Sequence, residues 1–218
     1  MKKAVLFDLD GTLLDTLQDL QDSVNVTMER YGYPTHDYAT IRSFVGNGVK
    51  KLVERAMPEK EVAAHFDEVY AAFKAYYEVH MEDKTAPYGG VCEMLAALKA
   101  DGYSLAVVSN KFDSGVKALV SRFFGKWIDV AIGESETVRA KPAPDAPLAA
   151  LKAFGITAEE ALYVGDSDVD ITTAAAANIT DISVCWGFKD RDFLIERGAK
   201  ILVDTPDELY REIRRLSI

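Results

Sequence analysis

Cysteine, histidine and long hydrophobic runs are scarce in this sequence. Its 218 residues include two cysteines, Cys92 and Cys185, and three histidines. Two thiols cannot build the disulfide framework of a small secreted protein, so we expect plain buried thiols and a cytoplasmic protein. No apolar stretch approaches the roughly 20 residues of a membrane-spanning helix. The first apolar run, Ala4–Phe7, ends at Asp8, which is too early for a signal peptide.

Positive charge is also in deficit, with 25 basic side chains against 35 acidic ones and a formal net charge of -10. Such a balance repels phosphate backbones and anionic lipids, so we expect neither a nucleic-acid partner nor a membrane partner. A local positive pocket for a small anion remains compatible with it. Hydrophobic residues make up 49% and charged residues 28%, which excludes intrinsic disorder. The length suits one domain with a small appendage.

Short apolar runs bounded by Gly, Asp, Asn or Ser alternate with segments in which apolar residues recur every three or four positions. The runs are typical of strands buried on both faces, and the segments between them are typical of helices. The expected strands are Ala4–Phe7, Ser104–Ser109, Asp129–Gly133, Ala161–Gly165, Asp181–Cys185 and Lys200–Asp204. This alternation predicts an α/β fold, a parallel sheet between two layers of helices.

One region, from about Asp15 to Asp83, contains no convincing strand. Helices are expected over Thr16–Tyr31, Ile41–Val45, Val49–Met57 and Pro58–Met81, from apolar spacing and from stop signals such as Gly32 and Pro34. We therefore predict a core domain of residues 1–14 and 84–218, with a small all-helical domain of residues 15–83 inserted after the first strand.

Two carboxylates follow the first expected strand. Asp8 and Asp10 lie two positions apart, which places them on the same side of an extended segment, and Gly11 then permits a sharp turn. By themselves they also fit an ordinary solvated turn. Neighbouring carboxylates repel each other, however, and such a pair is stabilised by a cation or a shared proton.

More acid follows the fourth strand, at Asp166, Asp168 and Asp170. The alternation resembles the start of an EF-hand loop, but the sixth and twelfth positions hold Ile171 and Ala177 instead of Gly and Glu, which excludes that loop. Oxygen ligands without nearby His or Cys favour a hard cation such as Mg²⁺ over zinc. Asp168 is interpreted as a solvated carboxylate without a role.

Groups suited to an anion follow the second and third strands. Ser109 and Asn110 offer hydroxyl, amide and backbone donors, and Lys141 adds a positive charge. Because the carboxyl ends of parallel strands share one sheet edge, these groups should meet the aspartates. Carboxylates, Mg²⁺, neutral donors and one lysine together indicate a site for a phosphoryl group.

These four segments resemble the four motifs of the haloacid dehalogenase superfamily of phosphatases: Asp8–Leu13, Ser109-Asn110, Lys141-Pro142 and Gly165–Asp170. The helical insert resembles that family's C1 cap domain. Within the superfamily, Val45-Gly46-Asn47-Gly48 with the helix that follows, and Cys185–Phe188, are similar to phosphoglycolate phosphatases. The resemblance implies a Mg²⁺-dependent phosphatase for a small phosphorylated metabolite, acting as a monomer or homodimer.

The resemblance also implies roles for individual residues. Asp8 would be the nucleophile that forms an aspartyl-phosphate, and Asp10 the general acid and base. The Asp8 carboxylate, the Asp10 backbone carbonyl and Asp166 would bind Mg²⁺. The transferring oxygens would be neutralised by Ser109, Asn110 and Lys141, while Asp170 would orient Lys141 or the waters of the ion.

The substrate is less tightly constrained. Asn47 lies in the insert's Gly46-Asn47-Gly48 turn and Lys50 follows that turn. Both are candidates for contacting the leaving group, although a plain turn between helices is also possible. The best single substrate is 2-phosphoglycolate. Alternatives are a sugar phosphomutase resembling β-phosphoglucomutase, a pyrophosphatase and, more remotely, a binding module without catalysis.

Overall fold

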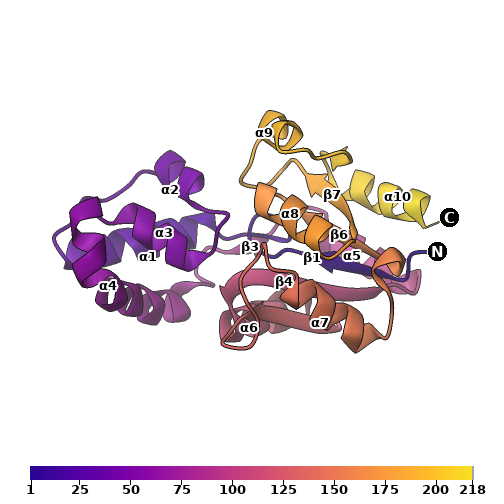
Figure 1. The fold of residues 1–218 in the computed structure, drawn as a ribbon, viewed down its shortest axis with the longest axis horizontal. Helices are drawn as coiled ribbons and strands as arrows, with labels where there is room; N and C mark the ends of the chain where they lie inside the picture. Colours follow the sequence, from indigo (N-terminus) through magenta and orange to yellow (C-terminus); the bar gives the residue numbers. More distant parts are fainter. Residues whose placement is uncertain (218) are drawn as a thin grey trace. The chain divides into compact units, whose positions relative to one another are not determined.

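Residues 1–217 are described by the structure, a computed structural model in which the chain divides into two compact units. One unit combines Met1–Leu14 with the chain from Pro87 onward, and the other is Asp15–Ala86. Figure 1 shows that the first contains the sheet with its helices and the second contains α1 to α4. The expected insert, residues 15–83, falls inside the second unit.

The first unit is built on a six-stranded sheet with strand order β5-β4-β1-β6-β7-β8. Its strands are β1 (Ala4–Phe7), β4 (Ser104–Phe112), β5 (Val130–Glu134), β6 (Ala161–Gly165), β7 (Thr180–Val184) and β8 (Leu202–Val203). Every neighbouring pair is parallel, which confirms the predicted parallel α/β fold. Because β1 lies between β4 and β6, the residues that follow these three strands meet at one edge of the sheet.

Helices cover the sheet on both faces. They are α5 (Val91–Ala100), α6 (Asp113–Phe124), α7 (Asp145–Phe154), α8 (Asp168–Ala176), α9 (Arg191–Glu196) and α10 (Pro206–Leu216), with a 3-10 turn at Ala158–Glu160. Every residue of β1 and β6 is buried, and successive strand residues point to opposite faces, so neither face is open to solvent. On one face Leu6 and Tyr163 share a cluster with Ala150 of α7 and Ala174 of α8.

Strands β5 and β7 are each displaced by one residue from the sequence prediction, and two other strands differ by more. Strand β4 continues past Ser109 to Phe112, because a register shift after Val108 lets Phe112 pair with Glu134. At one edge of the sheet, β8 is limited to Leu202–Val203, since only that short segment pairs with β7. The extension of β4 matters for the site, because it holds residues 109–111 in a strand rather than in a loop.

The second unit consists of α1 (Leu17–Arg30), α2 (Tyr38–Phe44), α3 (Val49–Ala56) and α4 (Glu59–His80). Val69, Phe73 and Tyr77 form the buried stripe of α4, at the four-residue spacing of one helix face. Asp19 of α1 is buried and accepts hydrogen bonds from the backbone N–H groups of Lys84 (3.0 Å) and Thr85 (2.8 Å). This carboxylate therefore ties the beginning of the unit to its end.

A separate two-stranded sheet of β2 (Leu14–Asp15) and β3 (Ala86–Pro87) contains both points at which the chain passes between the units. Cys92 and Cys185 are free and half-buried, so the prediction of buried thiols is wrong. Cys92 lies in the first turn of α5 and Cys185 directly follows β7, both at the ends of elements rather than in their packed centres.

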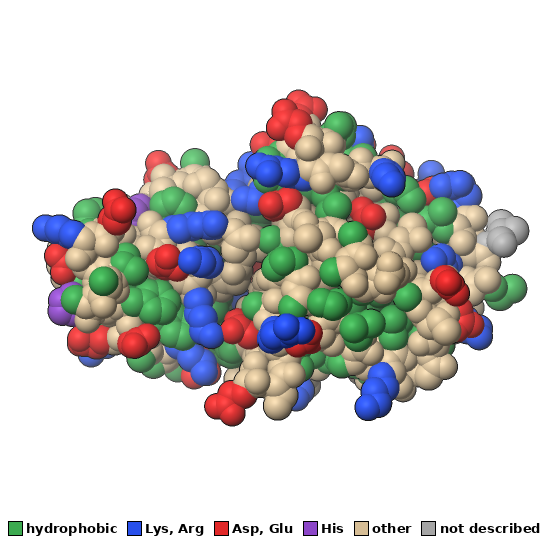
Figure 2. Space-filling model, viewed as in Figure 1, with side chains coloured by type: hydrophobic (Ala, Val, Ile, Leu, Met, Phe, Trp, Pro, Cys, Tyr) green, Lys and Arg blue, Asp and Glu red, His purple; other side chains and the backbone are tan. Residues whose placement is uncertain are grey.

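Acidic and basic side chains are interspersed over the face drawn in Figure 2 rather than gathered by sign. Many form exposed ion pairs, such as Lys117 Nζ with Asp113 Oδ2 at 2.5 Å. Exposed pairs of this kind contribute little stability each, so the buried strands and helix faces stabilise the fold. Along the described residues, no helix combines the length and the hydrophobicity needed to cross a bilayer.

Candidate active site

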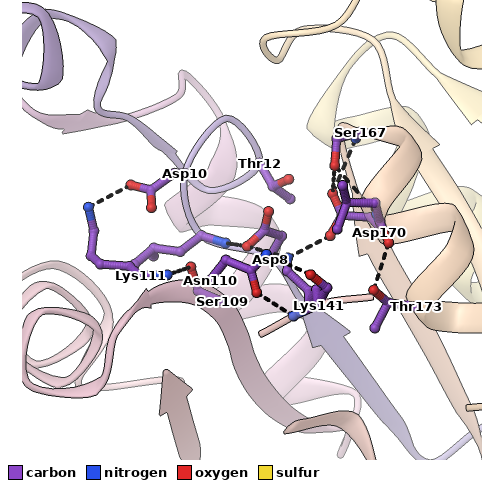
Figure 3. A network of polar contacts seen from close by, with 12 residues as sticks. Asp8, Asp10, Thr12, Ser109, Asn110, Lys111, Lys141, Ser167, Asp170 and Thr173 are labelled. Carbon is purple, nitrogen blue, oxygen red and sulfur yellow. Dashed lines mark hydrogen bonds and ion pairs between the residues drawn. The ribbon is translucent and has the colours of Figure 1, made fainter. Parts of the chain in front are cut away.

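A buried lysine joins two aspartates at the carboxyl edge of the sheet (Figure 3). Asp8 directly follows β1, and its Oδ1 accepts a hydrogen bond from the N–H of Leu9 at 2.7 Å. Lys141 Nζ lies 2.9 Å from Asp8 Oδ1 and 2.7 Å from Asp170 Oδ1. Burying unpaired charges is strongly unfavourable, so these three side chains depend on one another.

The charges in this group influence one another through their pKa values. Burial raises the pKa of Asp8 well above its ordinary range, and nearby Asp170 and Asp166 raise it further, while Lys141 opposes them. Burial lowers the pKa of Lys141, but Asp170 and Asp8 outweigh that effect and leave it well above the usual lysine value. Lys141 therefore stays cationic at neutral pH and pairs with both Asp8 and Asp170.

Both carboxylate oxygens of Asp170 have hydrogen-bond or ion-pair partners. Its Oδ1 also accepts a hydrogen bond from the Tyr163 hydroxyl at 3.0 Å, and its Oδ2 accepts from Ser167 Oγ at 2.5 Å and Ser167 N at 3.2 Å. Ser167 is the N-cap of α8, and its hydroxyl accepts from the Asp170 N–H in return. With two partners on each oxygen, the Asp170 carboxylate is fixed in position beside Lys141.

Three buried carboxylates could hold a metal ion here. Asp8, Asp166 and Asp170 each place one oxygen within 4.8 Å of the others. Burial, with Asp170 nearby, raises the pKa of Asp166 to about 7, while hydrogen bonds from Phe188 N (2.7 Å) and Thr12 Oγ1 (3.3 Å) oppose the shift. One ammonium cannot neutralise three carboxylates, so this all-oxygen cluster fits a hard divalent cation.

The expected phosphate ligands Ser109 and Asn110 also lie at this site, and the side chain of Asn110 is hydrogen-bonded to the backbone of Lys141. The side-chain oxygen of Asn110 accepts from Lys141 N at 2.5 Å, and its amide nitrogen donates to Lys141 O at 3.1 Å. Asn110 therefore fixes the backbone that carries Lys141. Ser109 is buried, and its hydroxyl accepts from Lys111 N at 3.2 Å. A hydroxyl that accepts in this way still has its own proton to donate.

Asp10 lies apart from the carboxylate cluster and pairs with a second lysine. Lys111 Nζ is 3.0 Å from Asp10 Oδ1, and the Lys111 side chain is 0% exposed. Sequence reasoning gave no role to Lys111 or to Tyr163. Two signals could have drawn attention to them: a lysine directly after Ser109-Asn110, and a tyrosine inside an otherwise aliphatic buried strand.

Within the helical unit, Asn47 lies between α2 and α3, and its Oδ1 accepts from the Arg55 guanidinium at 2.7 Å. Arg55 also donates to the carbonyl of Phe44 at 2.5 Å, so it links Asn47 to the end of α2. Lys50 is exposed in the first turn of α3.

The carboxylate cluster leaves no room beside Gly187. A Cβ there would lie 2.4 Å from both Asp166 Cβ and the carbonyl oxygen of Gly11. We expect Gly187→Ala to displace Asp166 and weaken Mg²⁺ binding by about 10-fold to 100-fold, as measured by isothermal titration calorimetry. Gly89→Ala is the matched control, since nothing lies within 4 Å of its added methyl group. Unchanged Mg²⁺ affinity in Gly187→Ala would exclude Asp166 as a ligand.

Comparisons with known proteins identify related sequences and structures. Residues 5–184 match the sequence family described as haloacid dehalogenase-like hydrolase. The phosphoglycolate phosphatase of Colwellia psychrerythraea is 33% identical over 98% of this chain and 98% of its own. That of Mesorhizobium japonicum is 35% identical over 86% of this chain and 84% of its own. A crystal structure of a protein from Lactobacillus delbrueckii subsp. bulgaricus, 36% identical, superposes with a TM-score of 0.94 and covers 98% of this chain and 99% of that one.

Proposed function

Since the chain belongs to the haloacid dehalogenase-like hydrolase family, we propose that it is a Mg²⁺-dependent phosphatase that hydrolyses 2-phosphoglycolate or a closely related small phosphomonoester. The observation that carries the proposal is the Asp8 carboxylate, which pairs with a buried lysine and belongs to a carboxylate cluster suited to a cation. The choice of substrate rests on the two phosphoglycolate phosphatases that resemble nearly the whole chain.

The first half-reaction transfers the phosphoryl group to Asp8. A carboxylate oxygen of Asp8 forms a bond to phosphorus while the bond from phosphorus to the ester oxygen breaks. Asp10 donates its proton to the departing alkoxide, which leaves as an alcohol. Because Asp8 directly follows the central strand, its nucleophilic oxygen is fixed before the substrate arrives.

The second half-reaction returns the enzyme to its starting state. Asp10, now ionised, removes a proton from a water molecule, whose oxygen attacks phosphorus. The bond between phosphorus and Asp8 then breaks and inorganic phosphate leaves. The same residue therefore acts as acid and then as base, which leaves both aspartates in their original protonation states.

Positive charge and hydrogen-bond donors stabilise the transferring oxygens. In the proposal, Lys141 and the Ser109 hydroxyl face these oxygens, and Asn110 contributes its backbone N–H because its side chain holds Lys141. Asp8 and Asp166, with the backbone carbonyl of Asp10, would hold Mg²⁺, which shields the approach of the anionic phosphoryl group to the carboxylate. Asp170 keeps Lys141 in place.

The helical unit is proposed to act as a cap that excludes water and selects the leaving group. Asn47 and Lys50 are the proposed contacts to the leaving group, and Arg55 would hold Asn47 in position for that contact. The proposed compartment is the cytoplasm, where the free thiols of Cys92 and Cys185 stay reduced.

Phosphate release tests the proposed function. Purified protein is assayed with Mg²⁺ and with EDTA against 2-phosphoglycolate, β-glucose 1-phosphate, pyrophosphate and an aryl phosphate. We expect Mg²⁺-dependent release with 2-phosphoglycolate as the best substrate. Isomerisation of the sugar phosphate without release would favour a mutase, and preference for pyrophosphate would overturn the choice of substrate. Absence of release from every compound would contradict the phosphatase proposal.

A further inference from the structure

Lys111 is a second buried lysine beside the catalytic carboxylates, and it has no role in the proposed phosphoryl transfer. The Lys111 side chain is 0% exposed, and its Nζ lies 3.0 Å from Asp10 Oδ1. An ammonium removed from water is strongly destabilising unless it is paired with an opposite charge. A buried lysine 3.0 Å from a carboxylate oxygen therefore indicates a role that involves that carboxylate.

The backbone around Lys111 is well fixed. Strand β4 runs on to Phe112, with a register shift after Val108, so residues 109–111 lie within the strand although their pairing is irregular. The N–H of Lys111 donates to Ser109 Oγ at 3.2 Å. The same segment, residues 109–111, therefore carries the proposed phosphate ligands and fixes the position of the Lys111 backbone.

The two buried lysines divide the aspartates into separate groups. Lys141 pairs with Asp8 and Asp170, while Lys111 pairs with Asp10. Figure 3 shows the Asp10 carboxylate turned toward Lys111, on the other side of Asp8 from Asp170. Without Lys111, the Asp10 carboxylate would be attracted to Lys141 or to a cation bound by the cluster, and either position would remove it from the leaving group.

We propose that Lys111 is a positioning residue that holds the Asp10 carboxylate away from the cation cluster and within reach of the leaving-group oxygen. This inference rests on the proposed function, because it takes Asp10 as the acid that protonates the leaving group. A general acid works only within hydrogen-bond reach of the atom it protonates. Lys111 itself touches no reacting atom in this account and acts through Asp10.

The way in which the loss of activity depends on the leaving group distinguishes positioning of Asp10 from direct binding of the phosphoryl group. An alkoxide needs a proton as it departs, whereas a dinitrophenolate does not. The ratio kcat/KM reports the steps up to transfer of the phosphoryl group to Asp8, so loss of Asp10 positioning should lower it for an alkyl phosphate and spare an activated aryl phosphate. A lysine that bound the phosphoryl group directly would lower kcat/KM equally for both.

The variant to test is Lys111→Met, which keeps the length of the side chain and removes its charge. We expect kcat/KM for 2-phosphoglycolate to fall by about 100-fold or more, within the usual contribution of general acid catalysis, and kcat/KM for 2,4-dinitrophenyl phosphate to fall less than about 10-fold. Lys111→Arg should recover most of the loss. The matched control is Lys117→Met, which removes a 62% exposed ammonium from α6 and should leave both values unchanged.

A double variant shows whether Lys111 acts through Asp10. If it does, adding Lys111→Met to Asp10→Asn should lower kcat/KM for 2-phosphoglycolate by less than about threefold further, because the group being positioned is already inactive. Additive losses, or equal losses on the alkyl and aryl substrates, would overturn the inference.

A crystal structure of Lys111→Met supplies a readout that needs no activity. The inference predicts that the Asp10 carboxylate rotates away from its present position, and an unmoved carboxylate would contradict it. If the unaltered protein releases no phosphate from any tested compound, the proposed function fails, and this structure alone then decides whether Lys111 positions Asp10.

Discussion

Replacing Asp8 with asparagine is expected to lower kcat by at least about 10⁴-fold, because the amide cannot form the bond to phosphorus that the carboxylate forms. The fold should be retained, since the side chains are nearly equal in volume and the Leu9 N–H can still donate to the amide oxygen. Steady-state phosphate release under saturating Mg²⁺ measures the loss. Circular dichroism and a thermal melt verify that the variant is folded.

Asp168→Asn is the matched control for this substitution. Asp168 follows the same sheet edge, two residues from Asp166, but it is half-buried in the first turn of α8 and has no place in the carboxylate cluster. We expect its kcat to stay within about twofold of the unaltered protein, as for a surface substitution away from the site. Near-normal turnover in Asp8→Asn would exclude Asp8 as the nucleophile.

Replacing Lys141 with methionine should damage both activity and stability. Activity should fall by about 10²-fold to 10³-fold through the loss of the cation that faces the transferring oxygens. Stability should fall by about 3–5 kcal/mol at neutral pH, because Asp8 and Asp170 remain buried without their common partner. Urea denaturation of the variant, with the exposed Lys117→Met as control, measures the second effect.

The pH dependence of this destabilisation has a definite sign. Asp170 and Asp8 hold the pKa of Lys141 above the usual lysine value, so the lysine stabilises the protein fully at neutral pH and loses that effect only as pH rises through its raised pKa. In Lys141→Met the destabilisation should shrink as pH falls, because protonated carboxyls need no cation. A variant that is equally destabilised at pH 5 and pH 8 would contradict the charge-based explanation.

Strands in the middle of the sheet were predictable from the sequence. The runs Ala4–Phe7 and Ala161–Gly165 match β1 and β6 residue for residue, because a fully buried parallel strand is a short apolar run with polar residues after it. Prediction was poorer for strands β8 and β4. Strand β8 pairs on one side only and keeps two residues, and β4 is extended by a pairing beyond its register shift.

The candidate site was predictable to the level of which residues meet, since parallel strands bring their carboxyl ends to one edge. Which side chain pairs with which was not predictable. The Tyr163 hydroxyl reaches Asp170 only because β6 leads into α8 with Ser167 as its cap, and Lys111 reaches Asp10 only through the irregular end of β4. Such pairings depend on side-chain directions that residue spacing does not contain.

The contacts of the Asn110 side chain were also not predictable from the sequence. Asn110, after the second strand, was predicted to bind phosphate, and in the structure its side chain holds the backbone of Lys141. Both uses require an amide, so the residue type alone could not distinguish them.

The central claim is that the Asp8 carboxylate becomes covalently phosphorylated during turnover. The most direct test quenches the protein in acid while it is hydrolysing 2-phosphoglycolate, reduces the acyl phosphate with borohydride and maps the product by peptide mass spectrometry. The account predicts homoserine at position 8, and none in Asp8→Asn. Continued hydrolysis with no modified residue, or with the modification at another aspartate, would contradict it.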